Sequence, residues 1–273
     1  MLTRNDATVE NALDLVEIAR ELGLRHIGFK DVGAEAPMLS RLTTAIRAAG
    51  ASPWMEVVAT TREAELRSVA LGRDLGVDLL MGGVHVEEAL RILKGSATRY
   101  LPFAGKPSGH PTRLAGSAAE VEAQCRAFAA VGCAGVDILA YRATEAEPLD
   151  LVAACRRGFL GQGAVVVAGS VNSAERVNAV RAAGADAFTI GTAAIECAYA
   201  PGVGSVAGQL TAVLEDCRVT GGGRAVVVHE EEIVRFGVFD HLEHSGVSLQ
   251  QDFANRPQIH EAYARRRTGS LWV

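Results

Sequence analysis

Two short apolar runs in the second half of the chain, VVVA at 165–168 and AFTI at 187–190, each end in a glycine and a hydroxyl residue. These pairs are Gly169 with Ser170 and Gly191 with Thr192. Glycine lets backbone N–H groups approach a phosphate, and the start of a following helix adds a positive dipole. The four residues are therefore candidates for binding the phosphate group of a small molecule.

Lys30 and Glu56 are the candidates for catalysis. Lysine and arginine together number 27, but only three of these residues are lysines, and Lys30 directly follows the apolar run 26–29. A partly desolvated lysine can have a lowered pKa and then act as a base or form a Schiff base. Glu56 lies within the apolar run WMEVV and needs a buried partner, which Lys30 on a neighbouring strand would supply. Proton transfer between the two is one interpretation, and an internal ion pair or a salt bridge of Lys30 with Asp31 is the other.

Further charged residues follow other expected strands. Asp137 lies within the apolar run 135–140, where it faces either the interior or the helix layer, and Arg142 follows as a candidate for gripping a carboxylate or phosphate. Lys106 and His110 belong to a long loop, 104–111, that either closes over the ligand or forms a rigid surface loop. Arg4 leaves the first expected strand at the same end and is a weaker candidate for substrate binding.

The elements that position these residues alternate regularly along the chain. Short apolar strands are followed by amphipathic segments of roughly 12 to 16 residues that predict helices. The expected strands are 1–4, 26–29, 54–58, 78–81, 99–103, 135–140, 165–168 and 187–190. Eight such units predict a parallel sheet closed into a (β/α)8 TIM barrel. Catalytic groups of such barrels lie at the carboxyl ends of the strands, and the recurring phosphate site follows strands seven and eight.

We expect the barrel to occupy residues 1–220 and a C-terminal extension to occupy 221–273, beginning at a run of three glycines. The extension is too short to hold much core alone, so it should pack on the barrel or on a partner subunit, and a homo-oligomer is expected. His241 and His244 have H-x-x-H spacing without a third ligand, which favours a polar helix over a metal site. No metal is expected.

Residues 164–196, AVVVAGSVNSAERVNAVRAAGADAFTIGTAAIE, resemble the ribulose-phosphate-binding barrel superfamily. That superfamily includes the histidine- and tryptophan-pathway isomerases, N-acylmannosamine-phosphate epimerase and keto-gulonate-phosphate decarboxylase. The resemblance implies phosphate binding at the four residues of the two glycine turns and identifies no catalytic residue. The histidine-pathway isomerase pairs carboxylates on strands one and five, whereas here strand five has none and Asp6 lies past strand one. FMN-dependent barrels share a similar phosphate turn.

The composition narrows the class of protein. A net charge of −5 argues against a general nucleic-acid surface. No apolar run approaches 18 residues and no charged N-terminal region precedes one, so we expect a cytoplasmic protein without a membrane span or signal peptide. Five scattered cysteines without a C-x-x-C pair suggest reduced core thiols.

Three functional hypotheses follow. The first is an enzyme that acts on a small phosphorylated, sugar-like substrate, with Lys30 and Glu56 or Asp137 performing imine or proton-transfer chemistry. Aldol cleavage, epimerisation, isomerisation and decarboxylation all fit, because each passes through an enolate, enediolate or enamine. The second is a flavin oxidoreductase that binds FMN at the same turn, and the third is a non-catalytic barrel that senses a ligand or acts as a scaffold. For the first hypothesis no cofactor is expected.

Overall fold

The computed structural model describes residues 1–218 of the 273-residue chain. The expected extension at 221–273, with its H-x-x-H pair at His241 and His244, lies outside the described residues. No helix within the described part has the length and apolarity needed to cross a bilayer.

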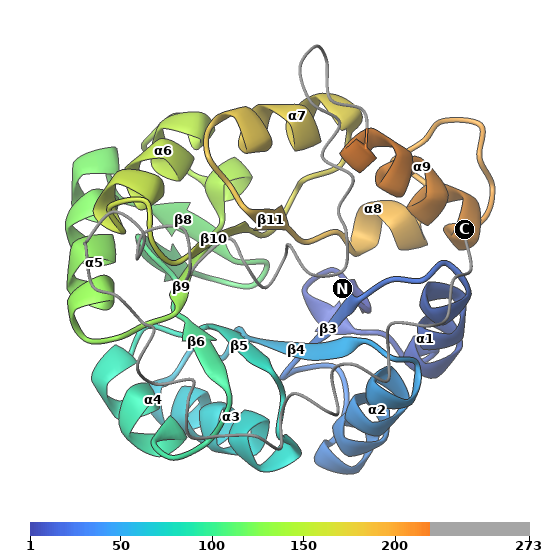
Figure 1. Ribbon diagram of the computed structural model, residues 1–273, viewed down its shortest axis with the longest axis horizontal. Coiled ribbons are helices and arrows are strands. Elements are labelled where there is room, and N and C mark those ends of the chain that lie inside the picture. Colours follow the sequence, from blue (N-terminus) through green and yellow to red (C-terminus); the bar gives the residue numbers. More distant parts are fainter. Residues whose placement is uncertain (219–273) are drawn as a thin grey trace, which may run out of the picture. The chain divides into compact units, whose positions relative to one another are not determined.

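Parallel strands surround the centre of the molecule, and helices cover them from outside (Figure 1). One ladder has the order β3-β4-β5-β6 and a second has the order β11-β10-β9. A parallel bridge between Phe103 and Asp137 connects β6 to β9 and so joins the two ladders. The strands are β3 (His26–Lys30), β4 (Ser52–Val57), β5 (Leu79–Gly82), β6 (Arg99–Leu101), β9 (Gly135–Ile138), β10 (Ala164–Val167) and β11 (Ala187–Phe188). The predicted parallel α/β barrel is confirmed.

The first barrel position differs from the expected strand at 1–4. Thr3–Arg4 (β1) pairs antiparallel with Ala7–Thr8 (β2), so this segment turns back on itself at Asn5 and Asp6. At this position residues 1 and 2 connect the segment after β11 to β3. The nitrogen of Met1 donates to the Ile190 carbonyl at 2.7 Å, and that of Leu2 donates to the Gly28 carbonyl, also at 2.7 Å.

The helices form the outer layer, and their ends carry the expected signals. Ser117 and Glu120 form a reciprocal capping box at the start of α5, and Thr61 caps α3 by accepting from the Ala64 amide. The helices are α1 (Ala12–Glu21), α2 (Ala36–Ala48), α3 (Arg62–Leu75), α4 (Val86–Leu93), α5 (Ala118–Ala130), the 3-10 turn η1 (Ala140–Arg142), α6 (Pro148–Gly158), α7 (Ala174–Ala182), α8 (Thr192–Ile195) and α9 (Val206–Arg218). The short α8 directly follows the last strand, and α9 completes the outer layer.

Successive side chains of each strand point to opposite faces of the sheet. One face packs against the helices and is apolar, and the other faces the barrel interior and carries the candidate catalytic residues. Phe29, Met55, Leu80 and Tyr100 occupy neighbouring register positions and are buried against the helices. Full burial of such a side chain contributes about 1.5 to 3 kcal/mol. The next register positions point to the barrel interior and hold Lys30, Glu56, Met81 and Leu101. The interior of this half of the barrel is therefore apolar on β5 and β6 but charged on β3 and β4.

The segment after β6 is structured rather than a simple long loop. Lys106–Ser108 (β7) pairs antiparallel with Arg113–Ala115 (β8), which makes a hairpin whose tip is 109–112. Leu114 anchors the second arm because its carbonyl accepts from both the amide and the hydroxyl of Thr144, at 2.8 and 3.1 Å. The hairpin lies at the barrel beside β9 and β10 (Figure 1).

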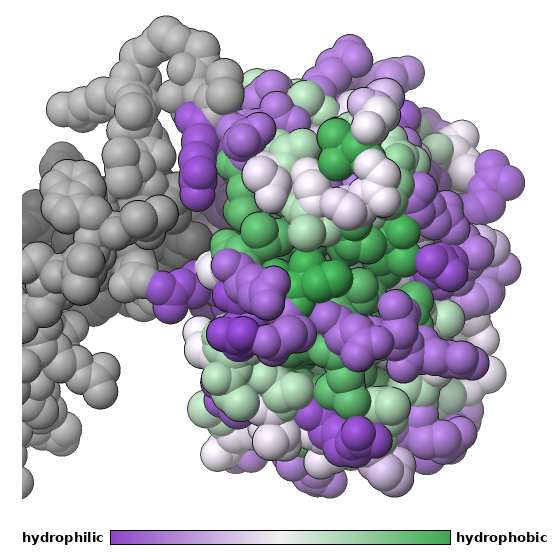
Figure 2. Space-filling view, turned by 90° about the vertical axis from the view of Figure 1, so that its right-hand side faces the viewer, coloured by the Kyte–Doolittle hydropathy of each residue, from purple (hydrophilic) through white to green (hydrophobic). Residues whose placement is uncertain are grey.

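Two further features of the described residues concern apolar surface and thiols. Figure 2 shows hydrophobic side chains gathered on one face of the described part. A pocket within the described residues is lined mostly by apolar side chains, among them Leu15 of α1, Ile195 of α8 and Leu210 of α9. All five cysteines are free thiols, and three of them are buried, as expected for reduced core thiols.

Candidate active site

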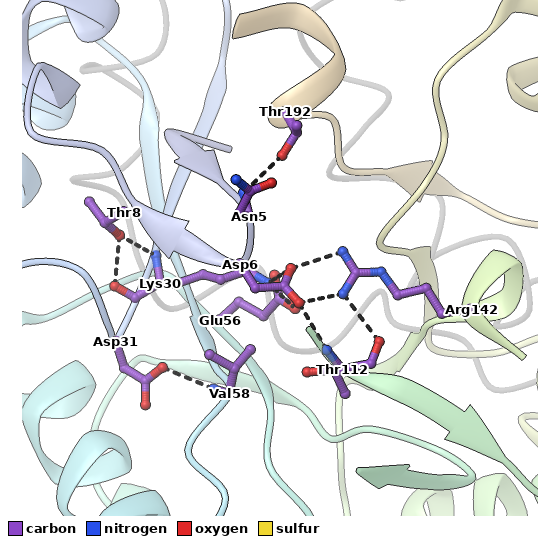
Figure 3. A network of polar contacts seen from close by, with 10 residues as sticks. All are labelled: Asn5, Asp6, Thr8, Lys30, Asp31, Glu56, Val58, Thr112, Arg142 and Thr192. Carbon is purple, nitrogen blue, oxygen red and sulfur yellow. Dashed lines mark hydrogen bonds and ion pairs between the residues drawn. The ribbon is translucent and has the colours of Figure 1, made fainter. Parts of the chain in front are cut away.

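Lys30 and Glu56 meet at the carboxyl ends of adjacent strands, as the sequence predicted. They are register partners on β3 and β4, and Lys30 Nζ lies 3.3 Å from Glu56 Oε1. Both side chains are buried, with 6% and 2% of their surface exposed. Lys30 is the member of the Lys30-Asp31 pair that faces inward, whereas Asp31 accepts from the Val58 amide at 2.9 Å. The two side chains lie with Asp6 and Arg142 in one network (Figure 3).

Asp6 joins this cluster, although it was not among the site residues predicted from the sequence. It sits in the turn between β1 and β2 with φ 62°, and its carboxylate points into the barrel mouth. Its Oδ1 accepts from Lys30 Nζ at 3.0 Å and from Arg142 Nη2 at 2.8 Å. Its Oδ2 accepts from Arg142 Nη1 and from the Thr112 amide. Burial raises the pKa of Asp6, but the hydrogen bonds and charges of Arg142 and Lys30 outweigh it and hold the pKa well below its usual range.

The charge state of Lys30 differs from the sequence expectation. Burial alone lowers the pKa of an amine, and this effect was the basis for expecting a reactive neutral lysine. The carboxylates of Glu56 and Asp6 act in the opposite direction and prevail, so the pKa of Lys30 is raised above its ordinary value. The expectation of a lowered pKa was wrong, and Lys30 is an ammonium group at neutral pH.

Asp137 on β9 is a completely buried carboxyl group close enough to Glu56, Lys30 and Arg142 to interact electrostatically with all three. Neither of its oxygens has a hydrogen-bond partner within residues 1–218, and the same holds for Glu56 Oε1. Burial and the neighbouring Glu56 charge raise the pKa of Asp137 well above its usual range. The raised pKa favours the protonated form of Asp137, which lies close to Glu56 and to the Lys30 ammonium.

Changing Asp137 to asparagine tests this protonation state. Because the pKa of Asp137 is higher in the folded than in the unfolded chain, the wild type loses stability as the pH rises above about 4. The free energy of unfolding of Asp137→Asn, relative to wild type, should therefore grow by about 1.4 kcal/mol per pH unit above that value, up to the folded pKa. Urea unfolding between pH 4 and pH 7 measures this difference. A difference that stays constant over the range would mean that the pKa of Asp137 is not raised in the fold, and the exposed control Asp14→Asn measures the background of the assay.

Arg142 lies between this cluster and the first glycine turn. Its guanidinium makes a two-pronged contact with Asp6, and its Nη1 also donates to the Thr112 carbonyl at 3.3 Å. A Cβ atom at Gly169 would lie 2.4 Å from Arg142 Nε, so only glycine allows the guanidinium this close to the turn. Nε has no hydrogen-bond acceptor among residues 1–218. Arg142 thus has an unused donor directly beside Gly169.

The two glycine turns, for which the sequence predicts phosphate binding, follow β10 and β11. Gly169 and Ser170 both have positive φ, 75° and 60°, while Gly191 is packed so closely on Thr3 that a Cβ would lie 2.6 Å from its hydroxyl. The amides of Gly169, Ser170, Gly191 and Thr192 donate to no acceptor within the described chain. Thr192 Oγ1 accepts from the Asn5 amide at 3.2 Å. The turns therefore offer unused donors.

A further cation near the first turn was not singled out from the sequence. Arg176 stacks on the Tyr141 ring, 4.4 Å from its centroid, and donates to the Ser170 carbonyl. The sequence signal that could have identified Arg176 is its place at the third residue of α7, the helix that follows the turn.

Two of the predicted substrate-binding residues, Lys106 and Arg4, have acidic partners away from the charged cluster, and a third, His110, is exposed. Lys106 is exposed at the base of the hairpin and bonds to Glu120 at 2.6 Å, so its ammonium is engaged on α5. His110 is exposed at the hairpin tip, and no contact within residues 1–218 ties it to the charged cluster. Arg4 pairs with Glu196 at 3.5 Å, with both side chains about half exposed. The chain reverses at Asn5 and pairs as a hairpin after Gly105, and this backbone course sets the positions of the three side chains.

No protein-family model and no curated protein matches the sequence. Solved structures do match in fold. The orotidine 5'-phosphate decarboxylase of Pyrococcus horikoshii OT3 superposes with a TM-score of 0.57 at 12% identity, over 77% of this chain and 95% of that one. A mandelate oxidase variant with the C4a-OH-FMN adduct gives 0.55 at 14% identity, over 75% of this chain and 67% of that one. The thiamine phosphate pyrophosphorylase of Pyrococcus furiosus gives 0.50 at 14% identity, over 75% and 89%. At identities of 12 to 14%, these likenesses confirm the α/β-barrel fold.

Proposed function

We propose that this chain is an enzyme that acts on a small phosphorylated, sugar-like substrate through an enolate or enediolate intermediate. The observation that carries the proposal is the buried cluster of Lys30, Glu56 and Asp137 at the carboxyl ends of the strands, next to two turns with unused amides. The fold neighbours include enzymes of phosphorylated substrates, by their names, and this agrees with the proposal without specifying a reaction.

The phosphate would be held at the glycine turns. The amides of Gly169, Ser170, Gly191 and Thr192 supply neutral donors, and Arg142 and Arg176 supply positive charge at the first turn. Charge-assisted hydrogen bonds of this kind are about twice as strong as neutral ones. Binding the non-reacting phosphate end fixes the position of the rest of the substrate, which lowers the entropic cost of the reaction.

The reacting carbons would lie at Lys30. An ammonium group in a dry site stabilises the negative charge that develops on an enolate oxygen. The Glu56 side chain lies beside it and can accept the proton of a carbon next to a carbonyl group, while Asp137, whose pKa is raised, can deliver a proton to the intermediate. Isomerisation, epimerisation and decarboxylation share this intermediate, and the cluster serves each of them.

Exchange of substrate hydrogen with solvent deuterium tests the proposal. Triose, pentose and hexose phosphates incubated with the full-length protein in D2O should lose the NMR signal of a hydrogen next to the carbonyl group in at least one case. Lys30→Met should slow this exchange at least about 100-fold, because the cation next to the developing charge is lost. Unchanged hydrogen content in every compound, together with no detectable binding of inorganic phosphate, would refute the proposal.

An imine mechanism makes a different prediction for the same lysine. Imine formation requires a neutral amine, and the raised pKa of Lys30 opposes it. Borohydride reduction in the presence of sugar phosphates should therefore leave Lys30 unmodified. Detection of a reduced adduct at Lys30 would mean that Lys30 forms a covalent imine with the substrate and does not act as an ammonium group.

The flavin alternative uses the same turn. Its support is the fold shared with a mandelate oxidase whose structure holds an FMN adduct. A flavin absorption band in the purified protein, or uptake of added FMN, would favour this alternative over the phosphosugar enzyme.

A further inference from the structure

The proposed reacting group is shut off from solvent in this structure. Lys30, Asp6 and Thr112 are each at most 6% exposed, and Asp137 is fully buried. Thr112 lies in the tip of the β7–β8 hairpin, next to Asp6 and Arg142 of the charged cluster (Figure 3). A substrate can reach Lys30 only if the hairpin tip or the other residues that bury Lys30 move.

Asp6 connects the hairpin tip to the charged cluster. Its carboxylate accepts the Thr112 amide at 3.0 Å, the Lys30 ammonium at 3.0 Å and both Nη groups of Arg142. These partners come from the hairpin, from the end of β3 and from the turn after β9. One carboxylate thus bonds to all three of these elements.

The hairpin has a firm base and a tip that depends on Asp6. At the base, the Gly105 amide donates to Gln124 at 2.6 Å and the Gly116 amide donates to Glu145 at 2.8 Å. Gly105 and Gly116 both have positive φ, 90° and 111°, a conformation that glycine tolerates best. At the tip, the bonds to the rest of the barrel run from Thr112 to Asp6 and Arg142. Opening of the tip therefore requires release of these bonds and leaves the base in place.

We propose that Asp6 is the positioning residue of this site: it orients Lys30 and Arg142 together and latches the hairpin over Lys30 through the Thr112 amide. This role rests on the proposed function in that Lys30 is taken as the group that the substrate must reach. Arg142 links the latch to the phosphate site, because its unused Nε lies beside Gly169 while its Nη groups hold Asp6 and Thr112. An anion at the Gly169 turn then shares Arg142 with the latch.

The three lysines of the chain provide a direct measurement. Lys94 and Lys106 are exposed and serve as internal references for Lys30. With a lysine-acetylating ester and mass spectrometry, Lys30 of the full-length wild type should react much more slowly than either reference. In Asp6→Asn, acetylation of Lys30 relative to Lys94 should increase about 10-fold or more, since the loss of a charge-assisted bond favours local opening. Amide hydrogen exchange of the peptide 109–115 should accelerate in parallel.

Glu56→Gln is the matched control. It removes the other carboxylate next to Lys30 and so makes the amine more reactive, but it leaves the Thr112 bond intact. It should raise Lys30 acetylation without accelerating exchange in 109–115. Asp6→Glu keeps the charge and should restore part of the protection. A circular-dichroism spectrum like that of the wild type shows that each variant is folded.

The outcomes separate this proposal from the proposed function. Equal exchange in 109–115 for Asp6→Asn and wild type would overturn the latch, whatever the protein catalyses. Failure of inorganic phosphate to bind the wild type, with accelerated exchange in Asp6→Asn, would leave the latch intact and count against the phosphate site. Faster exchange in both Asp6→Asn and Glu56→Gln would mean that the cluster as a whole, and not Asp6, holds the hairpin, and would also overturn the proposal.

Discussion

Replacing Lys30 by methionine is expected to lower the free energy of unfolding at pH 7 by about 3 to 5 kcal/mol. The methionine side chain has a volume similar to that of lysine, so the loss of stability arises from the removal of the charge. Asp6 keeps Arg142 as a partner, but Glu56 is 2% exposed and Lys30 is its one ion-pair partner among the described residues. A buried carboxylate without a partner is among the most destabilising changes in a protein interior. Urea unfolding followed by circular dichroism measures the loss.

Two further variants identify the cause. Lys94→Met removes an exposed lysine and should change stability by no more than about 0.5 kcal/mol. The double variant Lys30→Met/Glu56→Gln should regain a substantial part of the loss, because the neutral amide no longer needs a cation. The difference between the double variant and the sum of the single variants gives the coupling between the two residues. If Lys30→Met is as stable as Lys94→Met, the ammonium is not buried against Glu56.

The part of this site that could be predicted from the sequence is the part that regular structure positions. Lys30 and Glu56 end consecutive parallel strands, so their side chains had to meet at one edge if both faced inward. Asp137 and Arg142 could be placed at the same edge for the same reason. The turns at Gly169 and Gly191 follow the next strands, and their small residues indicated a close approach of backbone.

Asp6 reaches the site through an irregular turn, and strand periodicity carries no information about such turns. Asn5 and Asp6 both adopt positive φ, with values of 49° and 62°, which reverses the chain and aims the carboxylate inward. Asparagine and aspartate tolerate this conformation better than other side chains do, so the pair Asn-Asp after the first strand was a usable signal. The same reversal directs Arg4 to Glu196 rather than to the barrel mouth.

The hairpin and the charge of Lys30 depend on contacts between distant segments. Pairing of 106–108 with 113–115 takes Lys106 to Glu120, and a loop composition alone does not reveal such pairing. The pKa of Lys30 depends on whether burial or neighbouring carboxylates dominate. From the sequence, burial and one candidate carboxylate were visible, whereas the second carboxylate, Asp6, comes from 24 positions away. The direction of the shift therefore required the structure.

Replacing Gly169 by alanine is expected to weaken the binding of inorganic phosphate by at least about 10-fold. The new Cβ would lie 2.4 Å from Arg142 Nε and 3.0 Å from its Cδ, so the guanidinium has to move. Arg142 is held at its far end by Asp6 and Thr112, and for this reason it cannot swing aside without losing those bonds. The variant therefore loses the charged donor beside the turn as well as space for the anion. Isothermal titration calorimetry with phosphate measures the effect.

The control variant Gly161→Ala distinguishes the loss of phosphate affinity at Gly169 from the effect of backbone strain. Gly161 has φ 79°, close to the 75° of Gly169, but a Cβ there would meet no atom within 4 Å. Both variants should lose about 1 kcal/mol of unfolding free energy through the unfavourable φ. Gly161→Ala should nevertheless bind phosphate like the wild type, because it lies before β10 and away from the turn. Equal phosphate affinity in the two variants would contradict an anion site at Gly169 and remove the main support for a phosphorylated substrate.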